Sequence, residues 1–197
     1  MKINYNNCLK ELINKLDYKP SLLLHSCCGP CSTHVIKVLE NNFNITVLYY
    51  NPNIEPEEEY IKRKNEQIKF LKEKNIPLLD IEYNHEEFIK LSKGLENEPE
   101  GKKRCIKCIH HRLKVTKEKA EANSFEYFGT TLTVSPHKNS EIINNLGRVL
   151  QTDFTKFLFS DFKKENGYLD SINLAKEYNL YRQDYCGCLL AKDSSKK

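Results

Sequence analysis

Residues 22–31 read LLLHSCCGPC, an apolar run that passes directly into a turn with three cysteines. The run at 22–25 has the composition of a buried strand, and residues 35–39 have apolar side chains at helical spacing. We therefore expect a strand, a sharp turn, and a helix that begins near Ser32 or Thr33. The three cysteines would then lie in the first β–α turn, at the carboxyl end of the strand.

The same alternation continues along the chain. Four more short runs rich in apolar and β-branched residues are predicted strands, at 45–51, 77–83, 127–133 and 157–160. Amphipathic segments lie between the strands, and a predicted helix at 5–17 precedes the first one. This pattern predicts an α/β fold, a single-domain three-layer sandwich with a mainly parallel sheet over residues 1–197. We expect a core over about 20–190, a frayed tail at 192–197, and ligands outside the carboxyl ends of the strands.

A chain of 197 residues is long enough to bury a core without disulfide bonds. It has no apolar run of membrane-spanning length and no apolar signal-peptide segment at its start, so we expect a cytoplasmic protein without a membrane partner. Thiols stay reduced in that compartment, so grouped cysteines favour metal binding or redox catalysis. The net charge of +4 gives no whole-protein argument for a nucleic-acid partner.

Seven of the eight cysteines fall into three tight groups. The groups are Cys27, Cys28 and Cys31, then Cys105 and Cys108, then Cys186 and Cys188. Thiolates select iron–sulfur clusters, zinc or copper(I), and a closed zinc site uses four of them. Seven thiolates are better explained by a four-thiolate iron–sulfur cluster, with the others used for a second metal or for redox chemistry, including a disulfide bond. Cys8 stands alone and is expected to be a small apolar residue of the first helix.

Positive charge is concentrated around the second cysteine group. Residues 102–119 carry eight Lys and Arg against one Glu. Such a stretch is either a solvated helix face or a phosphate-binding patch, and charge alone leaves both interpretations open. Arg104 and Arg112 are also available to offset the negative charge of a thiolate cluster. The nucleic-acid-binding candidates are Lys102, Lys103, Arg104, Arg112, Lys114 and, on a later loop, Lys138.

Two histidines follow predicted strands. His25 ends the first strand and is expected to be a buried, hydrogen-bonded core residue. His137 and Lys138 lie in a polar loop after the strand at 127–133, at the same sheet edge as the cysteines. In that loop Lys138 is a candidate phosphate contact and His137 a candidate for proton transfer, and a plain turn is the competing interpretation.

Six motifs in order carry a resemblance to a known family. They are LLLHSCCGPCS, YYNPNIEPEEEY, KRCIKCIHHRL, TTLTVSPHKN, SDFKKENGY and LYRQDYCGC. Together they resemble the QueH-type epoxyqueuosine reductases, the cobalamin-independent enzymes that finish the queuosine modification of tRNA. The resemblance implies a fold like the adenine-nucleotide alpha-hydrolase (HUP) domains. It also implies a [4Fe-4S] cluster and an adjacent mononuclear iron, held by cysteines that match the three groups.

The reaction implied by this resemblance is the two-electron, two-proton reduction of epoxyqueuosine to queuosine, with release of water. The substrate is tRNA with epoxyqueuosine at the anticodon wobble position, and an external donor supplies the electrons. The basic stretch at 102–119 would bind the anticodon stem-loop. His137, Asp161 and Tyr185 are, in that order, the candidate proton donors. At the position of His137 the family usually has a tyrosine.

Two other interpretations use the same residues. A PP-loop-like iron–sulfur tRNA sulfurtransferase shares the fold, but it needs a glycine-rich SGGxDS loop after the first strand to bind ATP, and HSCCGPCS is not such a loop. A zinc-stabilised RNA-binding module would contain zinc without sulfide, and three spare thiolates argue against it. Metal content and a requirement for ATP distinguish these interpretations.

Overall fold

The protein is built around one parallel sheet. The computed structural model describes residues 3–190. The strands, all parallel, are β1 (Ser21–His25), β2 (Asn44–Tyr49), β3 (Leu78–Asp80), β4 (Tyr127–Thr130) and β5 (Lys156–Phe157). Their order across the sheet is β3-β2-β1-β4-β5, so the chain winds outward in both directions from β1. This doubly wound arrangement confirms the predicted α/β fold class and places the switch point between β1 and β4.

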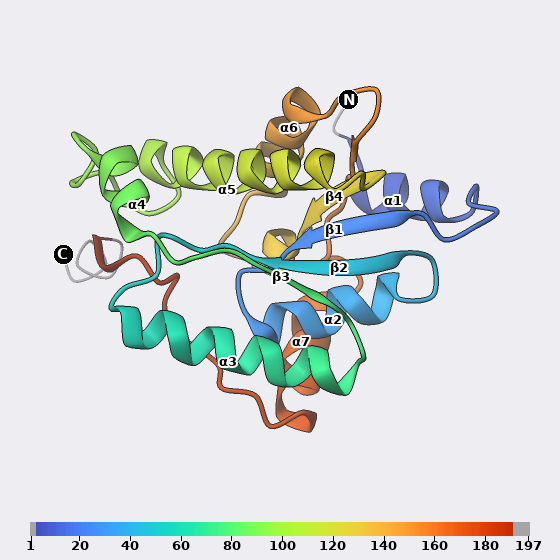
Figure 1. The fold of residues 1–197 in the computed structure, drawn as a ribbon, viewed down its shortest axis with the longest axis horizontal. Coiled ribbons are helices and arrows are strands. Elements are labelled where there is room, and N and C mark those ends of the chain that lie inside the picture. Colours follow the sequence, from blue (N-terminus) through green and yellow to red (C-terminus); the bar gives the residue numbers. More distant parts are fainter. Residues whose placement is uncertain (1–2, 191–197) are drawn as a thin grey trace.

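Helices cover both faces of the sheet. Within the described residues the helices are α1 (Tyr5–Ile13), α2 (Gly29–Leu39), α3 (Glu57–Glu73), α4 (His85–Ser92), α5 (Lys103–Ala122), α6 (Ser140–Leu150) and α7 (Gly167–Glu177), with a 3-10 helix η1 (Thr131–Val134). Figure 1 shows α5 and α6 on one side of the sheet and α2, α3 and α7 on the other, which gives three layers. Across residues 3–190, no helix combines the length and the apolar character that a membrane span requires.

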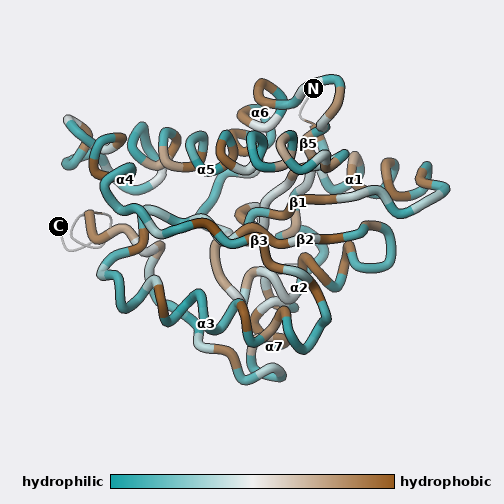
Figure 2. The backbone as a smooth tube through the Cα atoms, in the orientation of Figure 1, coloured by the Kyte–Doolittle hydropathy of each residue, from teal (hydrophilic) through white to brown (hydrophobic). Residues whose placement is uncertain are grey.

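The core is divided by the sheet into two apolar clusters. Leu22 and Leu24 pack with Val35 of α2 on one face, whereas Leu23 packs with Leu113 of α5 on the other. Alternation along the strand explains this division, because successive side chains point to opposite faces. The three leucines are 0% exposed, and burial of each contributes about 1.5–3 kcal/mol. Figure 2 shows the result as hydrophobic strands between helices of mixed character.

The strands predicted at 77–83 and 157–160 are shorter in the structure, which has β3 at Leu78–Asp80 and β5 at Lys156–Phe157. Other boundaries also differ, and three of them have a local cause. Helix α2 begins at Gly29 rather than near Ser32, because Pro30 suits a first turn in which backbone N–H groups have no intrahelical partner. The strand predicted to reach residue 133 ends at Thr130, whose hydroxyl accepts from the Leu132 N–H and starts η1. The first helix ends at Ile13 rather than residue 17, and the chain continues with tighter i→i−3 hydrogen bonds.

Two helices of the structure were not predicted from the sequence. Helix α4 was missed, and so was α7, which buries Gly167, Ser171 and Ala175. These small residues have helical spacing but give no apolar periodicity, so the search for large apolar side chains overlooked them. The tail predicted at 192–197 lies outside the described residues.

Ion pairs of a partly exposed aspartate attach α7 to α2. Asp170 accepts from His34 Nδ1 at 2.8 Å and from Lys37 Nζ at 3.1 Å. Gly167 allows the close approach of the two helices, because a Cβ atom there would lie 2.5 Å from His34 Nε2. The contact fixes the helix that follows the turn with three cysteines.

Candidate metal centre

The first cysteine group lies where β1 passes into α2. The sulfur atoms of Cys27, Cys28 and Cys31 all lie within 4.8 Å of one another, and the first two are 3.8 Å apart. Hydrogen bonds from Cys28 and Cys31 hold the pKa of the Cys27 thiol well below its usual range, while the pKa of Cys31 is raised. The nearby N-terminus of α2 also favours negative charge. The turn therefore presents three soft donors to one point.

A buried polar network holds this turn in place. Gln67 of α3 accepts hydrogen bonds from the Ser26 hydroxyl at 2.5 Å and the Ser32 hydroxyl at 2.8 Å. A Cβ atom on Gly29 would lie 3.4 Å from the backbone of Glu66, so α3 packs closely against the turn. The side chains of Ser26, Ser32 and Gln67 are all 0% exposed. This buried network fixes the turn from the side of α3.

The other two cysteine groups meet in a second place, which we call the four-cysteine cavity. Its lining includes the remaining members of the three groups, Cys105, Cys108, Cys186 and Cys188. The first two lie three residues apart on α5 and therefore share one side of that helix. Burial raises the pKa of the Cys108 thiol. The cavity brings together residues that are about eighty positions apart in the chain.

Glu55 anchors the Cys186–Cys188 segment. Its backbone N–H donates to the Gly187 carbonyl at 2.9 Å, and one of its carboxylate oxygens accepts from the Leu189 N–H at 3.1 Å. Its carbonyl also accepts from the Tyr185 hydroxyl at 2.7 Å. Gly187 has φ of +107°, a conformation that side chains with a Cβ rarely adopt. The loop after β2 thus fixes the last two cysteines of the centre.

Three arginines are buried around the cysteines. Arg63, Arg104 and Arg112 are at most 2% exposed, and each has at least one side-chain N–H without a hydrogen-bond partner. An unpaired buried donor is costly unless an anionic acceptor meets it. Thiolates, or the sulfur atoms of a metal cluster, are acceptors of that kind. The donor set therefore fits an iron–sulfur centre better than it fits a purely structural core.

Lys138 connects the four-cysteine cavity with a larger cleft. Its Nζ lies 3.3 Å from Cys186 Sγ and 3.2 Å from a carboxylate oxygen of Glu100. Burial disfavours the ammonium, but Cys186 and Glu100 outweigh it and raise the pKa of Lys138. The same residue lines a cleft of about 830 Å³ between the loops that follow β4 and β5. A lysine predicted to contact phosphate instead has its charged end beside a cysteine.

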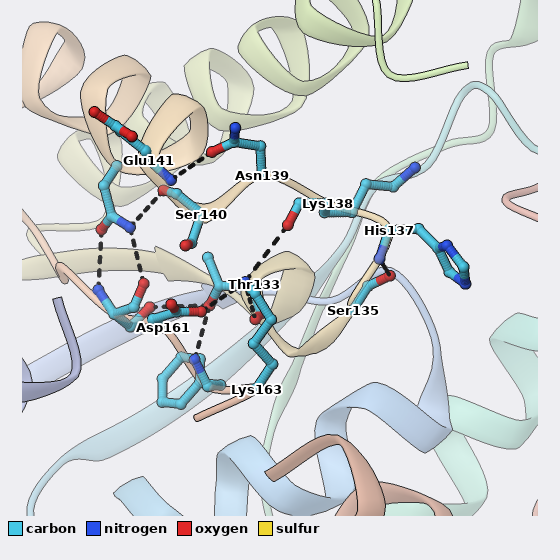
Figure 3. A network of polar contacts seen from close by, with 12 residues as sticks. Thr133, Ser135, His137, Lys138, Asn139, Ser140, Glu141, Asp161 and Lys163 are labelled. Carbon is cyan, nitrogen blue, oxygen red and sulfur yellow. Dashed lines mark hydrogen bonds and ion pairs between the residues drawn. The ribbon is translucent and has the colours of Figure 1, made fainter. Parts of the chain in front are cut away.

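The predicted proton donors occupy different places. His137 and Asp161 both line the cleft, and Asp161 forms an ion pair of 2.6 Å with Lys163. Figure 3 shows the His137 ring extending away from the network around Asp161. Tyr185 lies across the centre, with its ring over the Arg63 guanidinium at 4.8 Å. The structure thus brings two of the three candidates into one cleft.

The basic stretch divides into exposed and buried members. Lys102, Lys103 and Lys114 are exposed along α5, as a nucleic-acid contact requires. Arg104 and Arg112 are buried, so their environment does not fit the predicted contact with phosphates. It fits the alternative expectation that they offset thiolate charge.

Two further expectations concern His25 and the cysteines. His25 is 0% exposed, with ring nitrogens 2.9 Å from the Thr130 hydroxyl and 3.0 Å from the Tyr50 carbonyl. Burial, helped by Arg112, lowers its pKa to about 3, which confirms a neutral core histidine. No disulfide bond joins cysteines in the described residues, so the structure does not support the expected disulfide.

Sequence reasoning missed several residues of the centre. Glu55, Asn51 and Arg63 were not site candidates, although the first two lie in the YYNPNIEPEEEY segment directly after β2. Their place at the carboxyl end of a strand beside β1 was the available signal. Arg63 lies among charged residues of α3, where burial could not be recognised from the pattern.

Comparisons with known proteins agree on one family. Residues 22–194 match the family model described as epoxyqueuosine reductase QueH. A protein of that name from Streptococcus pyogenes serotype M1 is 42% identical over 200 residues, covering 96% of this chain and 78% of the relative. The protein of the same name from Staphylococcus epidermidis is 40% identical, covering 96% of this chain and 85% of the relative. The one from Thermotoga maritima is 36% identical, with coverages of 87% and 90%.

A solved structure shares the fold. It is the U34-tRNA thiolase NcsA from Methanococcus maripaludis with its [4Fe-4S] cluster, which matches with a TM-score of 0.60 over 98% of this chain and 70% of that chain. The two sequences are 13% identical, so this likeness concerns the fold alone. It agrees with the expected resemblance to adenine-nucleotide alpha-hydrolase domains.

Proposed function

The chain belongs to the QueH family of epoxyqueuosine reductases, oxidoreductases of tRNA modification, and we propose that its three cysteine groups form the metal centre of that reaction. The reaction converts the epoxide of epoxyqueuosine to the cyclopentene of queuosine. Both epoxide C–O bonds break and a C=C bond forms. Two electrons and two protons are consumed, and the oxygen leaves as water.

The seven cysteines supply enough thiolates for a [4Fe-4S] cluster and an adjacent mononuclear iron. The observation that carries this proposal is their convergence around buried arginines whose N–H groups lack partners. When bound, the metals supply electrons one at a time and a Lewis acid for the epoxide oxygen. The chain's own contribution is to hold seven cysteine sulfurs beside three buried arginines and Lys138, whose positive charge favours thiolates and opposes the effect of burial.

The cleft beside Lys138 is the proposed place for the modified nucleoside. Its volume of about 830 Å³ is in the range of small-molecule sites, and it shares Lys138 with the four-cysteine cavity. A nucleoside in the cleft would therefore reach the centre next to the Lys138 ammonium. His137 and Asp161 line the same cleft and are the proposed proton donors. The Tyr185 hydroxyl already donates to Glu55 and is placed third.

The RNA partner is the anticodon stem-loop of tRNA with epoxyqueuosine at the wobble position. The exposed lysines at the start of α5 would contact its phosphates, since they flank the cysteine pair of that helix. An external reductant of low potential would supply the electrons. A reducing cytoplasm suits a centre whose described cysteines form no disulfide bonds.

The direct test uses anaerobically purified protein, a low-potential chemical reductant, and an anticodon stem-loop with epoxyqueuosine, without ATP. Mass spectrometry of the digested RNA should show loss of one oxygen atom. Cys28→Ala and Cys188→Ala should abolish that loss, while Cys8→Ser serves as the matched control. Iron and acid-labile sulfide should both be present in the wild-type protein.

The two other interpretations give different results in the same experiment. A requirement for ATP, or sulfur in the product nucleoside, would favour a tRNA sulfurtransferase. One equivalent of zinc without sulfide would favour an RNA-binding module. The first result would refute the proposed reduction, and the second would refute the proposed iron–sulfur centre.

A further inference from the structure

Arg112 is a buried cation that faces all three cysteine groups. It follows Cys108 by four residues on α5, so both side chains share one face of the helix, and it lines the four-cysteine cavity. Burial works against its charged form, yet the surrounding sulfur atoms outweigh that effect and its pKa is raised. The sulfurs responsible belong to Cys108, Cys186, Cys27 and Cys105.

Its charge is balanced differently from the charges of Arg63 and Lys138. Arg63 has a carboxylate partner in Glu59 at 2.6 Å, and Lys138 has one in Glu100 at 3.2 Å. Among residues 3–190, no carboxylate lies within ion-pair distance of Arg112, and its Nε has no hydrogen-bond partner. A buried guanidinium without a carboxylate is costly unless another anion compensates it. The sulfur atoms of the centre are that anion.

Arg112 also has a structural connection to the first cysteine turn. Its Nη1 donates to Asn51 Oδ1 at 3.3 Å, and Asn51 Nδ2 donates to the Ser26 carbonyl at 2.8 Å. Ser26 directly precedes Cys27, and all three residues of this chain of contacts are buried. Helix α5, the loop after β2 and the turn after β1 are therefore joined through one guanidinium.

We propose that Arg112 is a positioning residue that holds the three cysteine groups around one metal centre and raises its reduction potential. The inference rests on the proposed function, because it assumes that a cluster is bound. Reduction adds negative charge to an already anionic centre. A fixed positive charge and N–H donors near sulfur stabilise the reduced state more than the oxidised state, so the potential rises.

The test compares Arg112→Gln, which removes the charge, with Arg112→Lys, which keeps it. Arg148→Gln is the matched control, because Arg148 is exposed on α6. Iron and sulfide per chain are measured first. The fraction of reduced cluster is then followed by electron paramagnetic resonance while the solution potential is changed under anaerobic conditions.

Arg112→Gln should lower the ratio of reduced to oxidised cluster about tenfold at a given potential, a shift of about 59 mV toward more negative values for one electron. Arg112→Lys should stay within about threefold of the wild type, and Arg148→Gln should not change the ratio. Loss of iron in the Gln variant alone would also support a requirement for the charge.

An unchanged potential in an iron-loaded Arg112→Gln protein would overturn the inference. So would loss of iron from both Arg112 variants, because lysine retains the charge. If the wild-type protein itself contains no iron and sulfide, the proposed function fails together with the inference. If the wild-type protein contains iron and sulfide but the variants do not behave as expected, the inference fails and the proposed function stands.

Discussion

Replacing Gly187 with alanine is expected to displace the two cysteines that flank it. Gly187 has φ of +107°, outside the region that alanine adopts without strain. An added Cβ atom would lie 2.7 Å from Ile54 Cγ1 and 3.2 Å from Ile54 Cα. Ile54 is 1% exposed, and the next residue, Glu55, is hydrogen-bonded to the Gly187 carbonyl at 2.9 Å. Neither side of the contact can move without breaking the anchor.

Two costs add at this position. A left-handed backbone conformation costs a residue with a Cβ about 1–2 kcal/mol. Insertion of a methyl group into a closely packed contact costs a further 1–3 kcal/mol or so. The Gly187→Ala protein should therefore lose about 2–5 kcal/mol, either as global stability or as displacement of the Cys186–Cys188 segment.

Gly94→Ala is the matched control, because Gly94 also has positive φ, +77°, but its Cβ would meet no atom within 4 Å. It should carry only the backbone cost. Urea unfolding and anaerobic iron content are measured for both variants. We expect Gly187→Ala to lose iron and to be about 1–3 kcal/mol less stable than the control. Equal stability of the two variants, with full iron content, would refute the packing argument.

Three further predictions concern other parts of the chain. Cys8→Ser should leave iron content and turnover unchanged, and loss of the cluster would show that α1 contributes a ligand. Asp170→Asn should lower the free energy of unfolding at pH 7 by about 1 kcal/mol. Burial works against the charge of Asp170, but hydrogen bonds from His34 and Lys37 outweigh it and lower its pKa. This stabilisation is present above 3.8, the pKa of the unfolded state, and is lost as the pH falls below it. The urea midpoints of the variant and the wild type should therefore converge at low pH. Equal midpoints at pH 7 would contradict the prediction. Joint replacement of three exposed lysines by alanine should weaken stem-loop binding without loss of iron. The slope of log binding constant against log salt concentration should become shallower by about one unit per lost contact. An unchanged slope would indicate that these lysines form only a solvated face. These residues are Lys102, Lys103 and Lys114.

The alternation of strands and helices could be predicted because β1 and β2 are continuous apolar runs in a sheet covered on both faces. The cysteines could be grouped because their spacing is short and their chemistry is specific. The sequence also places the first group correctly, since the turn after β1 follows directly from LLLH. These features depend on neighbours in the chain, and local patterns are sufficient for them.

The remaining features depend on contacts between distant segments. Arg104 and Arg112 have the sequence context of a solvated basic helix, and only the packing of α5 against the cysteines shows that they are buried. Glu55 looks like the start of an acidic surface run, yet its contacts with residues 185–189 anchor the last cysteine group. Charge patterns alone cannot distinguish a solvated charge from one that is compensated by a buried anion.

The geometry of the turn after β1 bears on the choice between a reductase and an ATP-dependent relative of the same fold. Phosphate binding at this position requires small residues and open backbone N–H groups at the start of the following helix. Here Cys28 occupies the N-cap position of α2 and is 0% exposed, and α3 packs within 3.4 Å of where a Gly29 Cβ would lie. A phosphate would have to displace sulfur or separate α3 from the turn. The place in the fold that could receive a nucleotide is therefore occupied by cysteines, which supports the proposed reduction without ATP over the sulfurtransferase interpretation.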